Sequence, residues 1–346
     1  MIVLLSNTSL RPGVFSSYQV SSFFTAGAGS SYAAVVAKTS EGNPNTLYSF
    51  ESYQQSLEVF TTGGMRGILK ILFESGISRV FAVAAEADYA QALTLIQEVD
   101  NIGAVVCDAQ DPPDLEALQQ SVENSSKALR ERLAFCGIDD ADKAAAAARA
   151  LNSERVCLCC PSAHPRDIDE ESAVFSAAAV AGVILASGDP ALNFSGHPLR
   201  SIANPKRLSE TTIQSLMAAG VTVVELSGEI VRIVRALTTR TSTSGLPDRS
   251  MSGINTPLII DNVISAVRSS LESHVRGRRI SGSSFESIAS QVTVVLASKR
   301  DDGLLHSFMP PRVRRHDSDP SVCVVELSFA VAHVLNQIHV TAHVQI

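Results

Sequence analysis

Cysteine and histidine occur in two stretches at spacings that could bind a metal ion. CLCC at residues 157–160 holds three thiols, and His339 and His343 are four residues apart in QIHVTAHVQI, residues 337–346. In a strand, neighbouring thiols point to opposite faces, and histidines four residues apart are separated by about 13 Å. A tetrahedral zinc site needs four convergent ligands, which neither stretch provides. We therefore expect no metal site, with the thiols buried as small apolar side chains and the histidines on the solvent side of a strand.

Two further stretches could support catalysis or phosphate binding. Asp189, Ser195 and His197 lie close together in SGDPALNFSGHPL, but the sequence contains no G-x-S-x-G nucleophile elbow. TTGGMRG at residues 61–67 could present free backbone amides at a helix start, but it lacks the Lys-Ser/Thr pair of a P-loop. GAG at residues 27–29 lacks the third glycine of a dinucleotide fingerprint. We predict no catalytic residues and no cofactor, and keep a Rossmann-like nucleotide- or small-molecule-binding enzyme as an alternative.

Two groups of arginines remain as candidate contact residues. The chain has net charge −7, but residues 249–346 hold 10 basic and 8 acidic side chains, which leaves net −9 on residues 1–248. This acidic body argues against a nucleic-acid partner, as do the low aromatic content of the whole chain, 5%, and its lack of tryptophan. A protein face of opposite charge is the better partner for exposed arginines. We predict such contacts at Arg276, Arg278, Arg279, Arg312, Arg314 and Arg315.

Short apolar runs alternate with amphipathic segments through most of the chain. This pattern is typical of a mostly parallel sheet with helices on both faces. The apolar runs predict strands at residues 33–37, 79–84, 103–108, 155–160 and 221–226. The segments between them predict helices at residues 65–75, 88–99, 112–136 and 173–187, with Gly76 and Gly137 ending the first and third. We expect the last helix, rich in Ala and Gly and too short to span a membrane, to be buried. The predicted core is α/β.

The C-terminal third has a different pattern. VVELSGEIVRIVRA predicts a hairpin turning at Ser227-Gly228, and the polar run TTRTSTSGLPD at residues 238–248 is the best linker in the chain. Helices are predicted at residues 257–275 and 284–299, followed by a loop at PPRVRRHD, residues 310–317, and an apolar strand at VCVVEL. This part is predicted to be a small α+β domain.

These patterns divide the chain into five parts. They are an N-terminal arm at residues 1–31, an α/β core at 32–240, a linker at 241–253, a C-terminal α+β domain at 254–330 and a C-terminal arm strand at 331–346. GAGSS at residues 27–31 is predicted to be a flexible hinge.

The two predicted arms carry strands with one apolar face. Burying the larger apolar side chains of residues 337–346 yields roughly 1.5 to 3 kcal/mol each, while fixing each of ten backbone residues costs about 1 to 2 kcal/mol. The strand therefore needs a sheet, earlier in this chain or in another copy of it. The face that we predict to be buried consists of Ile338, Val340, Ala342, Val344 and Ile346. The N-terminal counterpart consists of Val14, Tyr18 and Val20.

The six cysteines and the first residues bear on localisation. MIVLLSNTSLRPG has no basic stretch ahead of its apolar run, and most cysteines lie in apolar runs, so we expect a reducing compartment and synthesis in the cytoplasm.

Several stretches, in order along the chain, resemble the bacteriophage tail sheath family, the outer tube of contractile tails and related injection machines. They are RPGVFSSYQV, SAVFSAAAVAGVILASGDPALNFSGHPLRSI, LMAAGVTVVELSGEIVRIVRALTTRT, TPLIIDNVISAVRSSL and the alternating C-terminal strand. The resemblance implies a core with subtilisin-like topology, a C-terminal domain near the inner tube, and arms that pair with sheets of neighbouring subunits. It carries over no protease triad.

The resemblance also implies a function and partners. A sheath subunit polymerises helically with itself around an inner tail tube protein and meets baseplate and tail terminator proteins. Contraction then drives the tube through a target envelope. It implies a bacterial cytoplasmic origin, a phage tail or tailocin-like particle, and no direct membrane insertion. The arginine groups would contact the tube or a neighbouring subunit. Another self-assembling filament or shell protein is the second alternative.

Overall fold

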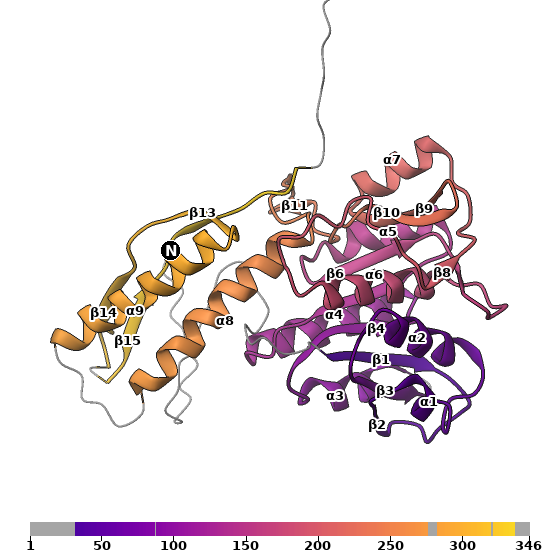
Figure 1. The fold of residues 1–346 in the computed structure, drawn as a ribbon, viewed down its shortest axis with the longest axis horizontal. Coiled ribbons are helices and arrows are strands. Elements are labelled where there is room, and N and C mark those ends of the chain that lie inside the picture. The colour runs from indigo at the N-terminus through magenta and orange to yellow at the C-terminus, as the bar shows by residue number, and fades with distance from the viewer. Residues whose placement is uncertain (1–31, 87, 276–281, 320, 336–346) are drawn as a thin grey trace, which may run out of the picture.

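The computed structural model describes residues 32–86, 88–275, 282–319 and 321–335. It has two parts, a layered sheet core and an elongated lobe that contains α8, α9 and the last strands (Figure 1). The two predicted arm strands, with Val14, Tyr18 and Val20 and with the five apolar residues from Ile338 to Ile346, lie outside the described residues, as do Arg276, Arg278 and Arg279.

The core sheet has eight strands: β1 (Tyr32–Lys38), β2 (Leu47–Phe50), β3 (Val80–Ala85), β4 (Ile102–Cys107), β5 (Leu133–Gly137), β6 (Val156–Cys160), β9 (Val221–Ser227) and β10 (Ile230–Arg235). Their order in space is β10-β9-β6-β5-β4-β1-β3-β2. The six inner strands are parallel, and β10 and β2 pair antiparallel at the two edges. The prediction of a mostly parallel sheet is confirmed.

Helices cover both faces of this sheet, as predicted. On one face lie α2 (Gly63–Glu74) and α6 (Ala173–Ser187), together with the short α1 (Tyr53–Ser56) near β2. On the other lie α3 (Ala90–Gln97), α4 (Pro112–Lys127), α5 (Ala141–Leu151) and α7 (Glu210–Ala218). Because side chains alternate along a strand, those of β6 point in turn towards the helices on one face and towards the helices on the other. Cys157 and Cys159 face the α6 layer, and Cys160 faces the other.

The predicted helix at residues 112–136 is wrong in its second half. The helix α4 ends at Lys127, and Leu129 has a positive φ of 64°. LAFCG at residues 133–137 forms β5, buried along its whole length between β4 and β6. A five-residue apolar run fits a buried helix turn or a buried central strand equally well, and here sheet pairing decides. The helix α5 was not predicted.

Backbone contact is closest where β5 ends against the start of α6. A Cβ added at Gly137 would lie 2.2 Å from the carbonyl carbon and oxygen of Ala173 and 2.5 Å from the amide nitrogen of Val174. The Asp139 carboxylate accepts a hydrogen bond of 2.7 Å from the Ala173 amide and so holds this helix start in place. Glycine is therefore needed at residue 137 for packing.

The lobe consists of two long helices and one bent ribbon. The helices are α8 (Asn255–Val275) and α9 (Gly282–Asp301), close to the two predicted helices. The strands are β13 (Leu305–Phe308), β14 (Arg312–Arg315), β15 (Cys323–Glu326) and β16 (Phe329–Val331). Because β13 pairs with β16 and β14 with β15, both antiparallel, residues 305–331 form one long two-stranded hairpin interrupted at Pro310-Pro311.

The predicted loop at residues 310–317 is therefore partly wrong. Arg312–Arg315 is a strand, with Val313 opposite Val325. The arginine-rich composition hides the strand in the sequence, and pairing with the apolar VCVVEL stretch overrides that composition.

The segment predicted as a linker packs closely against the core. Thr238 and Thr239 are completely buried. Residues 242–247 form a small hairpin, β11 (Ser242–Thr243) and β12 (Leu246–Pro247), which turns at Ser244 and Gly245 with positive φ of 51° and 79°. Two more short strands, β7 (His164–Pro165) and β8 (Ile202–Ala203), pair beside α6.

Replacing Gly137 by alanine should destabilise the core strongly. The new methyl group must displace the first turn of α6, so we expect a loss of about 3 kcal/mol of unfolding free energy in urea denaturation. Gly253→Ala is the matched control, because an added Cβ there meets no atom within 4 Å, and it should change stability by less than about 0.5 kcal/mol. Equal stability of the two variants would contradict the close packing of β5 against α6.

Candidate functional site

The candidate metal-binding residues fall into two groups. The thiols of CLCC are buried, whereas His339 and His343 lie outside the described residues. In the part of the chain that the structure describes, no group of three or more His, Cys, Asp or Glu side chains could hold a metal ion. Burial raises the pKa of the Cys107 and Cys159 thiols well above the ordinary value and that of Cys160 to about 12. Such thiols are poor nucleophiles at neutral pH.

The loop containing Asp189, Ser195 and His197 covers a sheet edge. The Gly196 amide donates to the Ile233 carbonyl at 2.6 Å, and the Ile233 amide donates to the His197 carbonyl at 3.0 Å. The Asp189 carboxylate accepts from the amide of Ala191, and the His197 ring packs edge-on against Phe194. Burial and the nearby Arg200 lower the pKa of His197. These contacts shield the backbone of the edge strand β10, which would otherwise be open to pairing.

A carboxylate lies at the candidate phosphate site, at the start of α2. The Glu41 carboxylate accepts hydrogen bonds from the Thr61 amide at 2.7 Å and the Thr62 amide at 3.0 Å, and from both threonine hydroxyls. These bonds lower the pKa of Glu41 to about 2, led by the Thr61 hydroxyl. The amides of Thr61 and Thr62, directly before α2, are therefore bound by the chain's own carboxylate. A bound phosphate at this helix start would be repelled by the negative charge of Glu41.

Replacing Glu41 by glutamine should reduce stability in a pH-dependent way. Because the folded-state pKa lies below the ordinary value of 4.5, the contribution is present above pH 4.5 and is lost as the pH falls towards 2. Solvent screens this exposed group, so we expect a loss below about 1 kcal/mol at pH 7 that vanishes near pH 2, measured by thermal denaturation. Glu58→Gln, at an exposed position nearby, serves as the control. A Glu41→Gln difference that does not depend on pH would refute this role.

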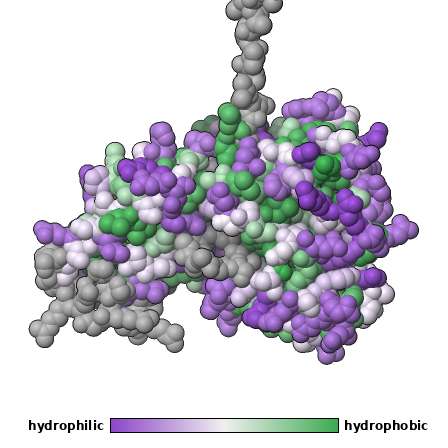
Figure 2. Space-filling view, in the orientation of Figure 1, coloured by the Kyte–Doolittle hydropathy of each residue, from purple (hydrophilic) through white to green (hydrophobic). Residues whose placement is uncertain are grey.

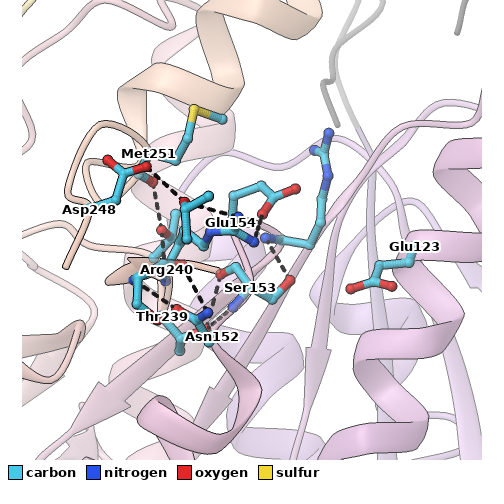
Figure 3. A network of polar contacts seen from close by, with 12 residues as sticks. Glu123, Asn152, Ser153, Glu154, Thr239, Arg240, Asp248 and Met251 are labelled. Carbon is cyan, nitrogen blue, oxygen red and sulfur yellow. Dashed lines mark hydrogen bonds and ion pairs between the residues drawn. The ribbon is translucent and has the colours of Figure 1, made fainter. Parts of the chain in front are cut away.

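A polar network joins the core to the segment that leads into the lobe (Figure 3). Asn152 ends α5 in the left-handed conformation, with φ of 39°, and its side-chain oxygen accepts from the amides of Thr241 and Ser242 at 3.0 and 3.1 Å. The Thr239 hydroxyl accepts from the Ser153 amide at 2.9 Å and donates to its carbonyl at 3.0 Å. The network therefore fixes the predicted linker to the core.

Nearby contacts extend this network on both sides. The Thr238 hydroxyl donates to the Met251 carbonyl at 2.8 Å, and Arg240 reaches Glu154 at 3.4 Å. The segment directly before α8 is thereby bound to the segment that follows β10.

Two arginine–carboxylate pairs then hold α8 against the sheet. Arg155 and Asp261 lie 3.2 Å apart with both side chains fully buried, and Arg268 binds Glu131. Asp261 and Arg268 are seven residues apart, so both lie on the same side of α8. Burial raises the pKa of Asp261, against the influence of Arg155, and lowers that of Arg155 to about 10. Arg155 directly precedes β6 and Glu131 lies two residues before β5, so the lobe is anchored at the amino ends of these strands.

Breaking the buried pair should cost far more than breaking an exposed one. Asp261→Asn leaves the Arg155 charge buried without its counter-ion, and we expect a loss of about 3 to 5 kcal/mol in urea denaturation. Glu51→Gln, which breaks the exposed pair of Glu51 with Arg79, should cost at most about 1 kcal/mol. The anchor would be disproved by an Asp261→Asn variant as stable as the Glu51→Gln variant.

The described arginines of the predicted contact surface lie on the lobe hairpin. Arg312, Arg314 and Arg315 are exposed on β14. Arg314 contacts Glu326 at 3.1 Å and Asp317 at 3.4 Å. Three carboxylates at Asp317, Asp319 and Glu326 balance the three arginines within this hairpin. Arginine spacing alone therefore overstated the local positive charge, and the contact role of these residues stays a prediction.

The lobe hairpin also has two open edges. Among the described residues, β13 and β14 pair only with β16 and β15, so each outer edge is left without a strand partner. A two-stranded ribbon is marginally stable alone, and open edges accept further strands. Large apolar side chains at Met309 and Leu335 are 66% and 69% exposed. Figure 2 shows several small groups of green apolar residues separated by purple ones on the visible face.

The described part of the chain contains no helix long and apolar enough to cross a membrane. No family model matches the sequence, and no curated protein matches it.

Solved structures do match the fold. A chain of the anti-feeding prophage (AFP) baseplate is 14% identical and aligns over 98% of this chain and 100% of its own length, with a TM-score of 0.72. A chain of the AFP helical sheath in the contracted state is 14% identical over 97% and 99% of the two chains, with a TM-score of 0.70. The sheath tail protein of Listeria innocua is 9% identical over 90% and 94%, with a TM-score of 0.71. The chain has the fold of contractile sheath proteins along nearly its whole length, as the sequence resemblance predicted.

Proposed function

We propose that the chain is the sheath subunit of a contractile tail or injection machine. It would polymerise helically around an inner tube and contract to drive that tube through a target envelope. The observation that carries the proposal is the end-to-end match to chains of contracted sheaths, which includes the lobe and not only the common α/β core. The finer description of the core as subtilisin-like is part of this proposal.

Strand exchange would link the subunits. The lobe hairpin leaves two edges open, and the sequence supplies two candidate strands, at residues 14–20 and 337–346. We propose that the C-terminal strand of one copy adds to the hairpin of the next, beside an N-terminal strand from a third. Such a contact is heterologous, since two different surfaces meet, and repeated heterologous contacts that do not close generate helical polymers.

Contraction would move rigid subunits on flexible connections. From the sequence, residues 238–248 were proposed to let the core rotate. In the structure the threonines at the start of this segment are buried, and two of its backbone amides donate to the side chain of Asn152. These contacts favour a core and lobe that move together, with the freedom placed at the predicted hinge, residues 27–31, and at the C-terminal arm.

The remaining expectations belong to the same proposal. The partners would be further copies of the chain, an inner tail tube protein, and baseplate and tail terminator proteins, without nucleic acid or membrane insertion. The protein would not be an enzyme, and would be made in the bacterial cytoplasm and assembled into a phage tail or tailocin-like particle. Glu41 at the start of α2 disfavours the nucleotide-binding alternative. A different filament or shell protein is the remaining alternative.

Electron microscopy of the purified protein tests the proposal. We expect hollow helical tubes at high concentration, whereas discrete particles would refute the sheath function. A solid filament or closed shell would favour the second alternative.

Removing residues 337–346 tests strand exchange. The truncated protein should keep its melting temperature but form no tubes, because the open hairpin edge has lost its strand. Val340→Asp, on the predicted apolar face, should act like the truncation, and Thr341→Asp, on the polar face, should polymerise as the unaltered chain does. Normal tubes from the truncated protein would show that this strand has another role.

A further inference from the structure

The last described residues of the chain are held by both parts of the molecule. The Ala332 amide donates to the Leu304 carbonyl of the lobe at 3.0 Å. The side-chain amide of Asn193, in the core loop between α6 and β8, donates to the Leu335 carbonyl at 2.8 Å. These bonds bracket four residues that run from the lobe to the core, directly before the segment predicted to pair with a neighbouring copy.

Asn193 is itself held in a fixed orientation. Its side-chain oxygen accepts a hydrogen bond of 3.0 Å from the Ser195 amide, two residues further on, which leaves the NH₂ group directed at Leu335. The assignment of oxygen and nitrogen follows from these contacts, because only the NH₂ group can donate to a carbonyl.

The loop that carries Asn193 is fixed from the other side by α8. The side-chain amide of Asn255, the first residue of α8, donates to the carbonyls of Pro190 and Leu192 at 2.9 and 2.7 Å. Asn255 is buried, with 7% of its surface exposed. Two asparagines therefore link the start of α8, the core loop and the departing chain in one series of hydrogen bonds.

We propose that Asn193 is the positioning residue that sets the direction in which the C-terminal arm leaves the subunit. An arm that must enter the sheet of another copy binds more tightly when its exit is already oriented, because less conformational entropy is lost on binding. The residue acts through Leu335 and does not itself contact the neighbour. The inference rests on the proposed strand exchange and assigns the residue that orients it.

Asn193→Asp isolates the one bond that matters. The carboxylate can still accept from the Ser195 amide, so the loop turn is kept, but it cannot donate to Leu335 and sets an oxygen against the carbonyl oxygen. Asn193→Ala, which removes both contacts, is the second variant. Asn45→Asp is the matched control, because it makes the same change of charge and also removes a side-chain donor. Asn45 lies in the loop between β1 and β2, where its side-chain amide donates to the side chain of Gln91.

The measurement is the critical concentration for tube formation, by sedimentation and electron microscopy of the full chain. We expect Asn193→Asp and Asn193→Ala to raise it about 3- to 10-fold, the loss expected for one hydrogen bond per subunit, with the melting temperature of the unpolymerised protein unchanged. Asn45→Asp should leave it unchanged.

The possible failures are distinct. If the unaltered chain forms no tubes, the sheath function fails and this inference with it. If the unaltered chain forms tubes, the truncation at residue 336 does not, and both Asn193 variants match the unaltered chain in critical concentration and helical parameters, only the role of Asn193 is wrong. If Asn193→Asp raises the critical concentration but also lowers the melting temperature of the unpolymerised protein, the residue supports the fold and does not orient the arm.

Discussion

A guanidinium and a carboxylate buried together, those of Arg155 and Asp261, determine how the two parts of this molecule sit relative to one another. Two opposite charges buried away from solvent must stay in contact, because burying either charge alone costs several kcal/mol of folding free energy. The pair therefore fixes α8 in rotation and in depth against the amino ends of β5 and β6. The second pair, Arg268 with Glu131, lies two helical turns further along the same side and fixes its tilt. A lobe held at two points along one helix cannot pivot about either point alone.

Because the lobe is fixed to the core, motion between copies would have to occur at other parts of the chain. If the lobe follows the core, any rearrangement between copies must be taken up by connections that few contacts hold. Among the described residues the lobe hairpin has two strands and two open edges, and in the proposed strand exchange it would receive such connections. A rigid junction suits the proposed strand exchange, because it holds the hairpin edges in a constant position relative to the core. Asn193 and Asn255 fit this arrangement, since they tie the departing chain to the junction itself.

The sequence revealed those elements in which burial and periodicity agree. The parallel strands are short apolar runs between helices with clear stops, and were found. The strand at residues 133–137 was predicted as part of a helix, because Leu129 and Leu133 continue the apolar spacing of that helix. In the structure the helical conformation is interrupted by the positive φ of Leu129. The strand at residues 312–315 was hidden by its arginines. The polar run at residues 238–248 suggested a linker, and only the structure reveals the threonines buried beneath it. Sequence reasoning missed the junction, because Arg155 and Asp261 are 106 residues apart, and no local pattern signals such a pair.

The acidic charge of the core has a local cause that composition could not reveal. Residues 86–171 hold 18 acidic and 7 basic side chains. Asp111 and Asp140 precede α4 and α5, Asp114 and Asp142 lie in their first turns, and Asp139 binds the first amide of α6. In a parallel sheet these helices all start at the carboxyl ends of the strands, where their positive ends favour carboxylates. The negative charge of these five aspartates is therefore a consequence of the fold, and need not indicate a basic partner. The lobe is anchored at the opposite ends of the strands, so this acidic edge of a copy faces away from its own lobe, and any contact it makes with a lobe hairpin must come from another copy.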